Sequence, residues 1–369
     1  MTQLQFKAIG GNWVVPPILL PASIPLELSG EGIRSRLITS PDGPDEELAL
    51  RPDLTLAVVR HFLETGADAP VSLRYFGRAF RRPVLEGEPL EFDQTGFEIL
   101  GEDNRLDADV RTLSAICQEV ASAGVRDAQL YVGDVSIFKA VLSALDLSDD
   151  WQIRLSRAFR RREGVQALLE ADVAAEEHSE LAETLSVMPA DKAAALLEEV
   201  MAFSKGGIVG GRTREEILER LRLRAASSAN RALPDRVKQA LSKLLEISGP
   251  PSVFLAQLKD LAVEFDLGLD EVISRQEKFF DALNTASVPF WSQANLSVQF
   301  GRRFDYYDGL VFELCHTALS SRRPIAAGGR YDGLVSWLSK DERALPAVGG
   351  VVRPDRLNQA LTIEKGAMS

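Results

Sequence analysis

The pattern of apolar positions divides the chain into strand-rich ends and a helical middle. Short apolar runs predict strands at 48–50, 71–76, 79–82, 92–100, 129–132 and 296–300, and from 347 onward. Apolar residues at helical spacing predict helices from about 56, 106, 137 and 354, with Ala-, Leu- and Glu-rich windows at 164–203, 214–225 and 235–263. We expect an α+β core domain of residues 1–133 and 291–369, interrupted by an inserted, mainly helical domain at 134–290.

The predicted strand at 92–100 has a polar face that is suited to ligand binding. Gln94, Gly96 and Glu98 share one face, while Phe97 and Ile99 take the other. Gln94 and Glu98 are about 13 Å apart along a strand, so converging side chains would hold both ends of an amino-acid-sized ligand. A solvent-exposed face explains the alternation equally well.

Asp53 precedes an apolar helical stripe that begins at Leu56. A carboxylate is favoured at a helix N-terminus, so plain helix capping and ligand binding explain Asp53 equally well.

Two polar segments near the C-terminus predict a pocket for a small zwitterion. The first, Arg302-Arg303-Phe304-Asp305-Tyr306-Tyr307, offers a cation for a carboxylate and phenols that donate and accept hydrogen bonds. The second, Gly328-Gly329-Arg330-Tyr331-Asp332-Gly333-Leu334, offers glycines where the backbone must approach another group closely, next to a further phenol.

Composition and charge exclude several classes of function. A formal charge of -12 argues against a surface built for nucleic acid. The three histidines lack metal-ligand spacing, and the two cysteines lie far apart without partner motifs, so we expect no metal site, no cofactor and a reducing compartment. No apolar window approaches a membrane span, and we expect a cytoplasmic protein. The glycines at 206–211 lack a following Gly-Lys-Ser/Thr and predict an interhelical loop.

Several segments resemble the catalytic domain of histidyl-tRNA synthetases, a class II aminoacyl-tRNA synthetase fold with an antiparallel sheet flanked by helices. The resemblance covers roughly 12–133 and 291–361. It rests on Leu50-Arg51-Pro52-Asp53-Leu54-Thr55, on Phe80-Arg81 and 92–98 as parts of motif 2, on 302–307 and 328–334 as the two histidine-specific motifs, and on Asp355-Arg356-Leu357 as the end of motif 3.

The resemblance implies a histidine site. It would place Asp53, Thr55 and Gln94 at the α-amino group, Glu98, Tyr307 and Tyr331 at the imidazole, and Arg302 near the carboxylate, with Tyr306 and Gly328 in the same motifs. Strand parity puts Arg302 and Tyr307 on opposite faces. A bulge at 303–305 would remove the difficulty, and Arg303 is the alternative carboxylate partner.

Departures from the family pattern affect the ATP site. Arg81 and Arg356 remain, but the acidic residue expected after Arg81 is missing, and the next loop reads Glu88-Pro89-Leu90-Glu91. Arg353 stands where the family has glycine, so its long side chain would crowd the adenine. Because the sequence stops shortly after motif 3, we expect a vestigial ATP site and no anticodon-binding domain.

A histidine pocket without an ATP site resembles the regulatory subunits of ATP phosphoribosyltransferase. That resemblance implies a non-catalytic subunit that assembles with a short-form catalytic subunit, serves the first step of histidine biosynthesis, and responds to histidine. It also implies a homodimer within a hetero-oligomer, without tRNA or membrane. The alternatives are a shortened ligase that activates histidine with ATP, and an assembly protein with a vestigial pocket. The basic helix with Arg154, Arg157, Arg160, Arg161 and Arg162 is a solvated face or meets an acidic partner.

Overall fold

Two compact units make up the chain. The computed structural model describes residues 4–41, 47–84, 87–160, 164–170, 233–300, 306–319, 323–340 and 342–367. Contacts group the chain into a larger unit, Met1–Asp146 with Lys243–Ser369, and a smaller unit, Leu147–Ser242. The larger unit contains every predicted site residue that the structure describes, and it is described first.

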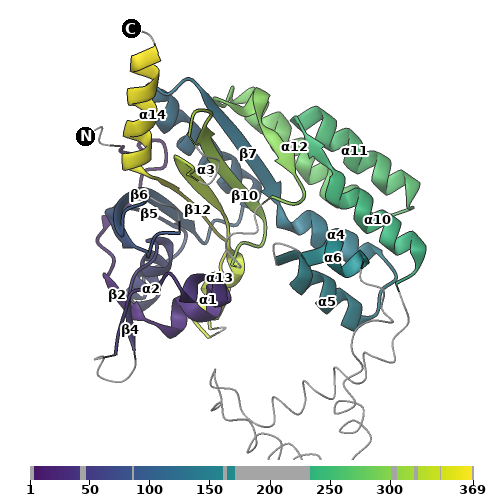
Figure 1. The fold of residues 1–369 in the computed structure, drawn as a ribbon, viewed down its shortest axis with the longest axis horizontal. Coiled ribbons are helices and arrows are strands. Elements are labelled where there is room, and N and C mark those ends of the chain that lie inside the picture. Colours follow the sequence, from purple (N-terminus) through teal and green to yellow (C-terminus); the bar gives the residue numbers. More distant parts are fainter. Residues whose placement is uncertain are drawn as a thin grey trace, which may run out of the picture. The chain divides into compact units, whose positions relative to one another are not determined.

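A mixed sheet forms the centre of the larger unit (Figure 1). Among the described residues it has nine strands, in the order β1-β5-β6-β12-β11-β10-β7-β9-β8. In that order their bounds are Asn12–Val14, Val71–Phe80, Glu91–Leu100, Ala347–Val352, Ala326–Arg330, Leu310–His316, Ala128–Asp134, Asn295–Ser297 and Ser248–Gly249. The central strands come from both ends of the chain, so the fold brings the early and late motifs together.

The expectation of an antiparallel sheet flanked by helices is right for the centre and incomplete at the margins. Every pairing from β5 to β7 across the sheet is antiparallel, but the short strands β1 and β9 pair in parallel with β5 and β7. These marginal strands have three residues each, which is too short for a sequence pattern to specify their direction. A second small sheet contains β2 (Leu19–Pro21), β4 (Leu48–Leu50) and β3 (Thr39–Ser40).

Helices of the larger unit cover the sheet on both faces. An added Cβ at Gly350 in β12 would meet Ile116 of α3 (Arg105–Ser122), so α3 packs on that face. On the other face, Thr55 at the start of α2 (Thr55–Thr65) bonds to Glu98 of β6. The remaining elements are α1 (Ser23–Arg34), α4 (Val135–Ala144), α11 (Pro251–Glu264), α12 (Asp270–Thr285), η2 (Trp291–Gln293), α13 (Asp332–Leu338) and α14 (Pro354–Ala367).

Strand β5 corrects the prediction of two strands separated at Gly77. The structure has one continuous strand, Val71–Phe80, paired along its length with β6. Gly77 marks a close approach instead of a break, because an added Cβ would lie 2.6 Å from Nη2 of Arg51. Arg51 is buried and donates to the carbonyl oxygens of Arg78 and Pro17, at 2.8 and 3.1 Å, so it ties the start of the chain to β5.

The smaller unit is helical where the structure describes it. It contains α5 (Asp149–Arg160), α6 (Gly164–Glu170) and most of α10 (Asp235–Glu246). The division leaves 134–146 and 243–290 with the larger unit, so it is narrower than the inserted domain expected at 134–290. The glycines at 206–211, Arg161, Arg162 and most of the helical windows at 164–203 and 214–225 lie outside the described residues. The limits of an independently folding insertion stay a prediction.

Among the helices that the structure describes, none combines the length and hydropathy needed to cross a lipid bilayer.

Candidate functional site

Glu98 is the centre of a buried polar cluster. It lies on β6, is fully buried, and accepts hydrogen bonds from three hydroxyl groups: Thr55 Oγ1 at 2.8 Å, Tyr75 OH at 2.9 Å, and Tyr331 OH. Burial raises the pKa of Glu98 to about 7, and the three hydroxyl donors partly offset this effect. A carboxylate has about four acceptor positions, so the group can accept one further donor.

Gly349 provides the space that the Glu98 carboxyl group occupies. The two residues are direct partners where β12 pairs with β6. A Cβ atom at Gly349 would overlap Oε2 of Glu98, and it would lie 2.5 Å from Cδ of Glu98 and 2.7 Å from the carbonyl oxygen of Phe97. Only glycine is therefore compatible with the carboxyl group in this position.

The segment before α2 forms one side of the cluster. The backbone N–H of Leu54 donates to Oε1 of Gln94 at 3.2 Å, and that of Leu56 donates to Oδ1 of Asp53 at 3.1 Å. Asp53 and Gln94 are both buried, so the polar face of β6 is covered and not exposed to solvent. Asp53 precedes Leu54, the N-cap residue of α2, and its bond from the first-turn N–H of Leu56 agrees with the prediction of a capping role. Burial raises the pKa of the Asp53 carboxyl, and the Arg81 charge opposes that rise.

Three phenols form the opposite side. The ring of Tyr306 lies 4.8 Å from that of Tyr307 and 6.1 Å, edge to face, from that of Tyr331. Burial raises the pKa of all three phenols, and the Glu98 charge raises it further, so they stay neutral near pH 7. The cluster therefore combines neutral hydroxyl groups with two carboxyl groups inside an apolar core.

The two glycines of β11 lie on different faces of the sheet. An added Cβ at Gly329 would lie 2.9 Å from Cε1 of Tyr307, whereas one at Gly328 would lie 2.5 Å from Cζ of Phe312. Gly329 pairs with Gly349 and so shares the face of Glu98, while Gly328 pairs with Gly350. The role predicted for Gly328 is untested, and Gly329 is the glycine on the face of the cluster. Arg302 and Arg303 lie outside the described residues.

The arginines predicted to remain from an ATP site have partners within the protein. Arg356 donates to Oε1 of Glu88 at 2.9 Å and to the carbonyl oxygen of Pro324 at 3.0 Å. Burial lowers the pKa of Arg356 to about 10, and the neighbouring Arg353 lowers it further against the effect of Glu88. Arg81 donates to the carbonyl oxygen of Pro52. Burial lowers the pKa of Arg81, and the Asp53 charge opposes this effect.

Arg353 covers the face of an aromatic ring in the same region. Its guanidinium carbon lies 3.6 Å from the ring centre of Phe92, and its nitrogens bond to both carboxylate oxygens of Asp355, at 3.0 and 2.8 Å. The Arg353 side chain is thus held in place by a cation–π contact and a bidentate ion pair.

Sequence reasoning missed three contributors. Tyr75 is a third donor to Glu98. It lies opposite Gly96 in the β5–β6 pairing, so its contact with Glu98 could be predicted only if the register of the two strands were known. Gly349 was predicted only to lie in a glycine-containing strand, and its close approach to the Glu98 carboxyl group was not predicted. The Arg356–Glu88 pair joins residues 268 positions apart, and neither side carries a local signal of the other.

Comparisons with known proteins identify the family of the chain. The histidyl-tRNA synthetase family model matches residues 3–208 and 210–357. An ATP phosphoribosyltransferase regulatory subunit from Agrobacterium fabrum is 34% identical over 96% of this chain and 94% of its own length. One from Chelativorans sp. is 33% identical over 92% and 91%.

Solved structures show the same fold. A protein from Bacillus halodurans, described as an ATP phosphoribosyltransferase regulatory subunit/histidyl-tRNA synthetase, matches with a TM-score of 0.64 and 20% identity, covering 96% of this chain and 76% of that one. Histidyl-tRNA synthetase from Nostoc sp. matches with a TM-score of 0.59 and 15% identity, covering 98% and 69%. These matches confirm the class II synthetase fold. The chain therefore belongs to the histidyl-tRNA synthetase family and groups with those members that are named ATP phosphoribosyltransferase regulatory subunits.

Proposed function

We propose that the chain is a non-catalytic regulatory subunit of ATP phosphoribosyltransferase that binds histidine at the Glu98 cluster. It assembles with a short-form catalytic subunit, as a homodimer within a hetero-oligomer, and serves the first step of histidine biosynthesis. The identity to proteins named as such subunits supports the assembly. The observation that carries histidine binding is the buried Glu98 carboxyl group with its ring of hydroxyl donors.

The chemistry of the cluster suits a histidine ligand. Glu98 has one acceptor position left for an imidazole N–H, and Tyr307 lies on the same face of the sheet. Asp53 and Gln94 provide oxygen atoms near the start of α2 that suit an ammonium group. Arg302 or Arg303 would complete the site at the ligand carboxylate.

Histidine controls the catalytic partner through linkage. A ligand shifts the assembly only if it binds the active and inactive forms with different affinity, and the partner must change histidine affinity by the same factor. Co-expression with a short-form catalytic subunit tests this. We expect phosphoribosyltransferase activity only in the mixed complex, and lower activity when histidine is added.

A Glu98→Gln variant separates the two parts of this proposal. We expect it to form the active complex and to lose most of its response to histidine, because position 98 lies in the buried cluster and not at the surface. A catalytic subunit that is equally active alone, or a complex that never forms, contradicts the regulatory role. A variant with an unchanged histidine response contradicts the site.

Arg356 and Arg353 each form an ion pair with a carboxylate of the protein itself, which supports the absence of ATP chemistry. Glu88 pairs with the Arg356 guanidinium. Arg353, which the family resemblance places where it would crowd the adenine, covers the Phe92 ring. A triphosphate would have to displace a carboxylate from Arg356 and compete with the Arg353–Asp355 pair.

We therefore expect no histidine-dependent exchange of pyrophosphate into ATP. The measurement is the isotope exchange assay with histidine, ATP and the purified chain, alongside a titration with ATP alone that should give no saturable heat. Exchange at a rate typical of a synthetase would show a ligase instead.

A further inference from the structure

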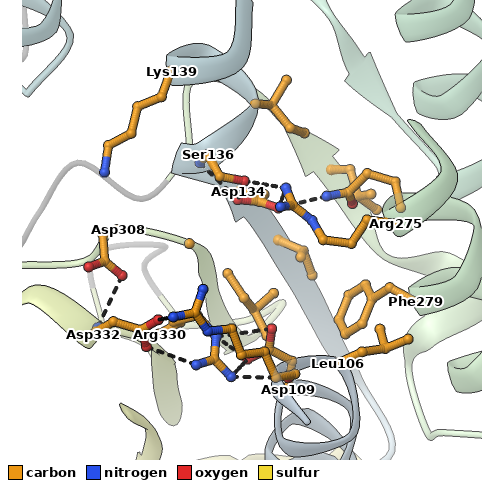
Figure 2. Close-up of a pocket in the computed structure, with 18 of the residues that line it drawn as sticks. Leu106, Asp109, Asp134, Ser136, Lys139, Arg275, Phe279, Asp308, Arg330 and Asp332 are labelled. Carbon is orange, nitrogen blue, oxygen red and sulfur yellow. Dashed lines mark hydrogen bonds and ion pairs between the residues drawn. The ribbon is translucent and has the colours of Figure 1, made fainter. Parts of the chain in front are cut away.

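A cavity separate from the Glu98 cluster lies in the larger unit, on the other face of the sheet (Figure 2). Its volume is about 290 Å³, near the lower end for small-molecule sites. Val132 of β7 lines it and pairs with Phe312, which in turn pairs with Gly328, on the face opposite Glu98 and Gly349. The cavity is bordered by α3, α4, α12 and the loop at 308–309.

The carboxylates around this cavity are occupied by donors of the protein itself. Asp134 accepts from Ser136 N at 2.9 Å, Gln276 Nε2 at 2.6 Å and Arg275 Nη2 at 3.2 Å. Asp308 accepts from the backbone N–H groups of Asp332 and Gly333, at 3.2 and 2.8 Å. These groups therefore have little capacity left for a cationic ligand.

The other two carboxylates are paired with Arg330. Arg330 uses Nε and Nη2 on Asp109, at 2.9 and 2.8 Å, and Nη1 on Asp332, at 2.8 Å. Asp332 also accepts from the backbone N–H of Ala347 at 2.8 Å. Because the Arg330 guanidinium is also paired with these carboxylates, we do not expect it to bind a ligand.

Three other cations retain free donors. The Lys139 ammonium group has no hydrogen bond or ion pair with any residue that the structure describes, and it acts only through its charge on Asp308. Among the residues that the structure describes, the Arg275 side chain bonds through Nη2 alone, to Asp134 and Ser136, and Arg105 bonds through Nη2 to Asp332 at 3.2 Å. Their side chains are 45% and 63% exposed, so all three cations reach solvent at the cavity.

The start of α4 carries Lys139 and a contact to Arg275. Lys139 follows Ser136 by three residues, so both lie on one side of the helix, and Ser136 contacts Arg275. The positive N-terminal end of this ten-residue helix adds to their effect. In the view of Figure 2, the Lys139 side chain lies above Asp308.

Apolar side chains form the remaining wall. Phe279 of α12, Leu106 of α3, Phe254 and Ile137 line the cavity. A ligand with only charged groups would leave this wall uncovered, while a wholly apolar ligand would leave the cations without partners. A small ring bearing an anionic group satisfies both.

We propose that this cavity is a second ligand site, for a small phosphate monoester with an aromatic or apolar ring. The phosphate lies against Lys139, Arg275 and Arg105, and the ring lies against Phe279 and Leu106. The site is independent of the histidine proposal, because its lining includes no residue of the Glu98 cluster.

Isothermal titration of the full chain with phenyl phosphate, inorganic phosphate and benzyl alcohol tests this site. We expect saturable binding of phenyl phosphate, about tenfold weaker binding of inorganic phosphate, and no saturable binding of benzyl alcohol. Lys139→Met removes one charge-assisted hydrogen bond and should weaken phenyl phosphate binding about tenfold or more. Arg275→Met should act in the same direction.

Lys278→Met is the matched control, because Lys278 is exposed on α12 with Arg275 but does not line the cavity. It should bind phenyl phosphate like the unaltered chain. The proposal is overturned if phenyl phosphate does not saturate, or if neither cation variant weakens it. Equal affinity for phenyl phosphate and inorganic phosphate would remove the ring from the proposal.

Discussion

Replacing Gly349 with alanine is expected to lower the free energy of unfolding by about 3 kcal/mol or more and to abolish histidine binding. The new methyl group would lie 2.7 Å from the carbonyl oxygen of Phe97 and would overlap the Glu98 carboxyl group. Strand β6 cannot move without breaking its pairing with β12. Turning the carboxyl group away would leave three buried hydroxyl donors without their acceptor. Urea unfolding followed by circular dichroism measures the loss.

Gly366→Ala is the control for this substitution. It lies in α14, where an added Cβ meets nothing within 4 Å, so we expect unchanged or slightly higher stability. A double-mutant cycle with Glu98→Ala tests the cause. Removing the carboxyl group should make Gly349→Ala less costly, because only the contact with Phe97 then remains. If Gly349→Ala is as stable as the unaltered chain, the close approach does not constrain the site.

The elements of the core were predictable because each has a strong local pattern. The alternation along β6 set the faces of Gln94 and Glu98, and the contacts of both residues with the segment before α2 agree with it. The stripe from Leu106 gave α3, and the glycine-containing run at 347–352 gave β12. Patterns of this kind report whether a face is apolar. They do not report whether a polar face is buried. For this reason the sequence could not decide between a ligand-binding face and a solvent-exposed face of β6.

The parts that could not be predicted depend on contacts between distant segments. Tyr75 reads as an ordinary strand residue until β5 is placed beside β6. Gly349 reads as a flexible position until β12 is placed on the other side of Glu98. Glu88 reads as part of an acidic loop until α14 brings Arg356 to it. In each case the two interacting groups lie in segments that are distant in the sequence, so neither segment alone indicates the contact.

On the proposed function, the Arg356–Glu88 pair is one way in which a nucleotide site would be lost while the fold is kept. The motif 3 arginine is still present at the start of α14, but a carboxylate from the loop between β5 and β6 now neutralises it. The Glu98 carboxyl group has no such cation among its described partners, which are hydroxyl groups, and the Arg81 charge acts on Asp53 instead. A side chain of the protein thus takes the place of a ligand group at Arg356, where Glu88 pairs with the guanidinium, but not at the Glu98 carboxyl group.

The affinity for histidine is expected to have a maximum between about pH 6.5 and pH 7 and to fall on both sides. Burial raises the pKa of Glu98 to about 7, close to the value of about 6.5 for an imidazole. The bound pair shares one proton. Below pH 6 both groups carry a proton, so binding must release one. Above pH 7.5 both have lost it, so binding must take one up. Each limb approaches a tenfold loss per pH unit away from the maximum, which gives a loss of about tenfold from pH 7 to 8.5.

Isothermal titration in buffers of different ionisation enthalpy measures this directly, because the proton count must change sign between pH 5.5 and 8.5. Glu98→Gln removes the titrating carboxyl group, so the fall above pH 7 should disappear while effects of Asp53 and of the ligand's amino group remain. It should also weaken binding at pH 7 by about 10- to 100-fold, through loss of a charge-assisted hydrogen bond. Glu91→Gln on the same strand is the control, since Glu91 is exposed and pairs with Arg78. A flat pH profile for the unaltered chain, or an alkaline fall that survives Glu98→Gln, would remove Glu98 from contact with the imidazole.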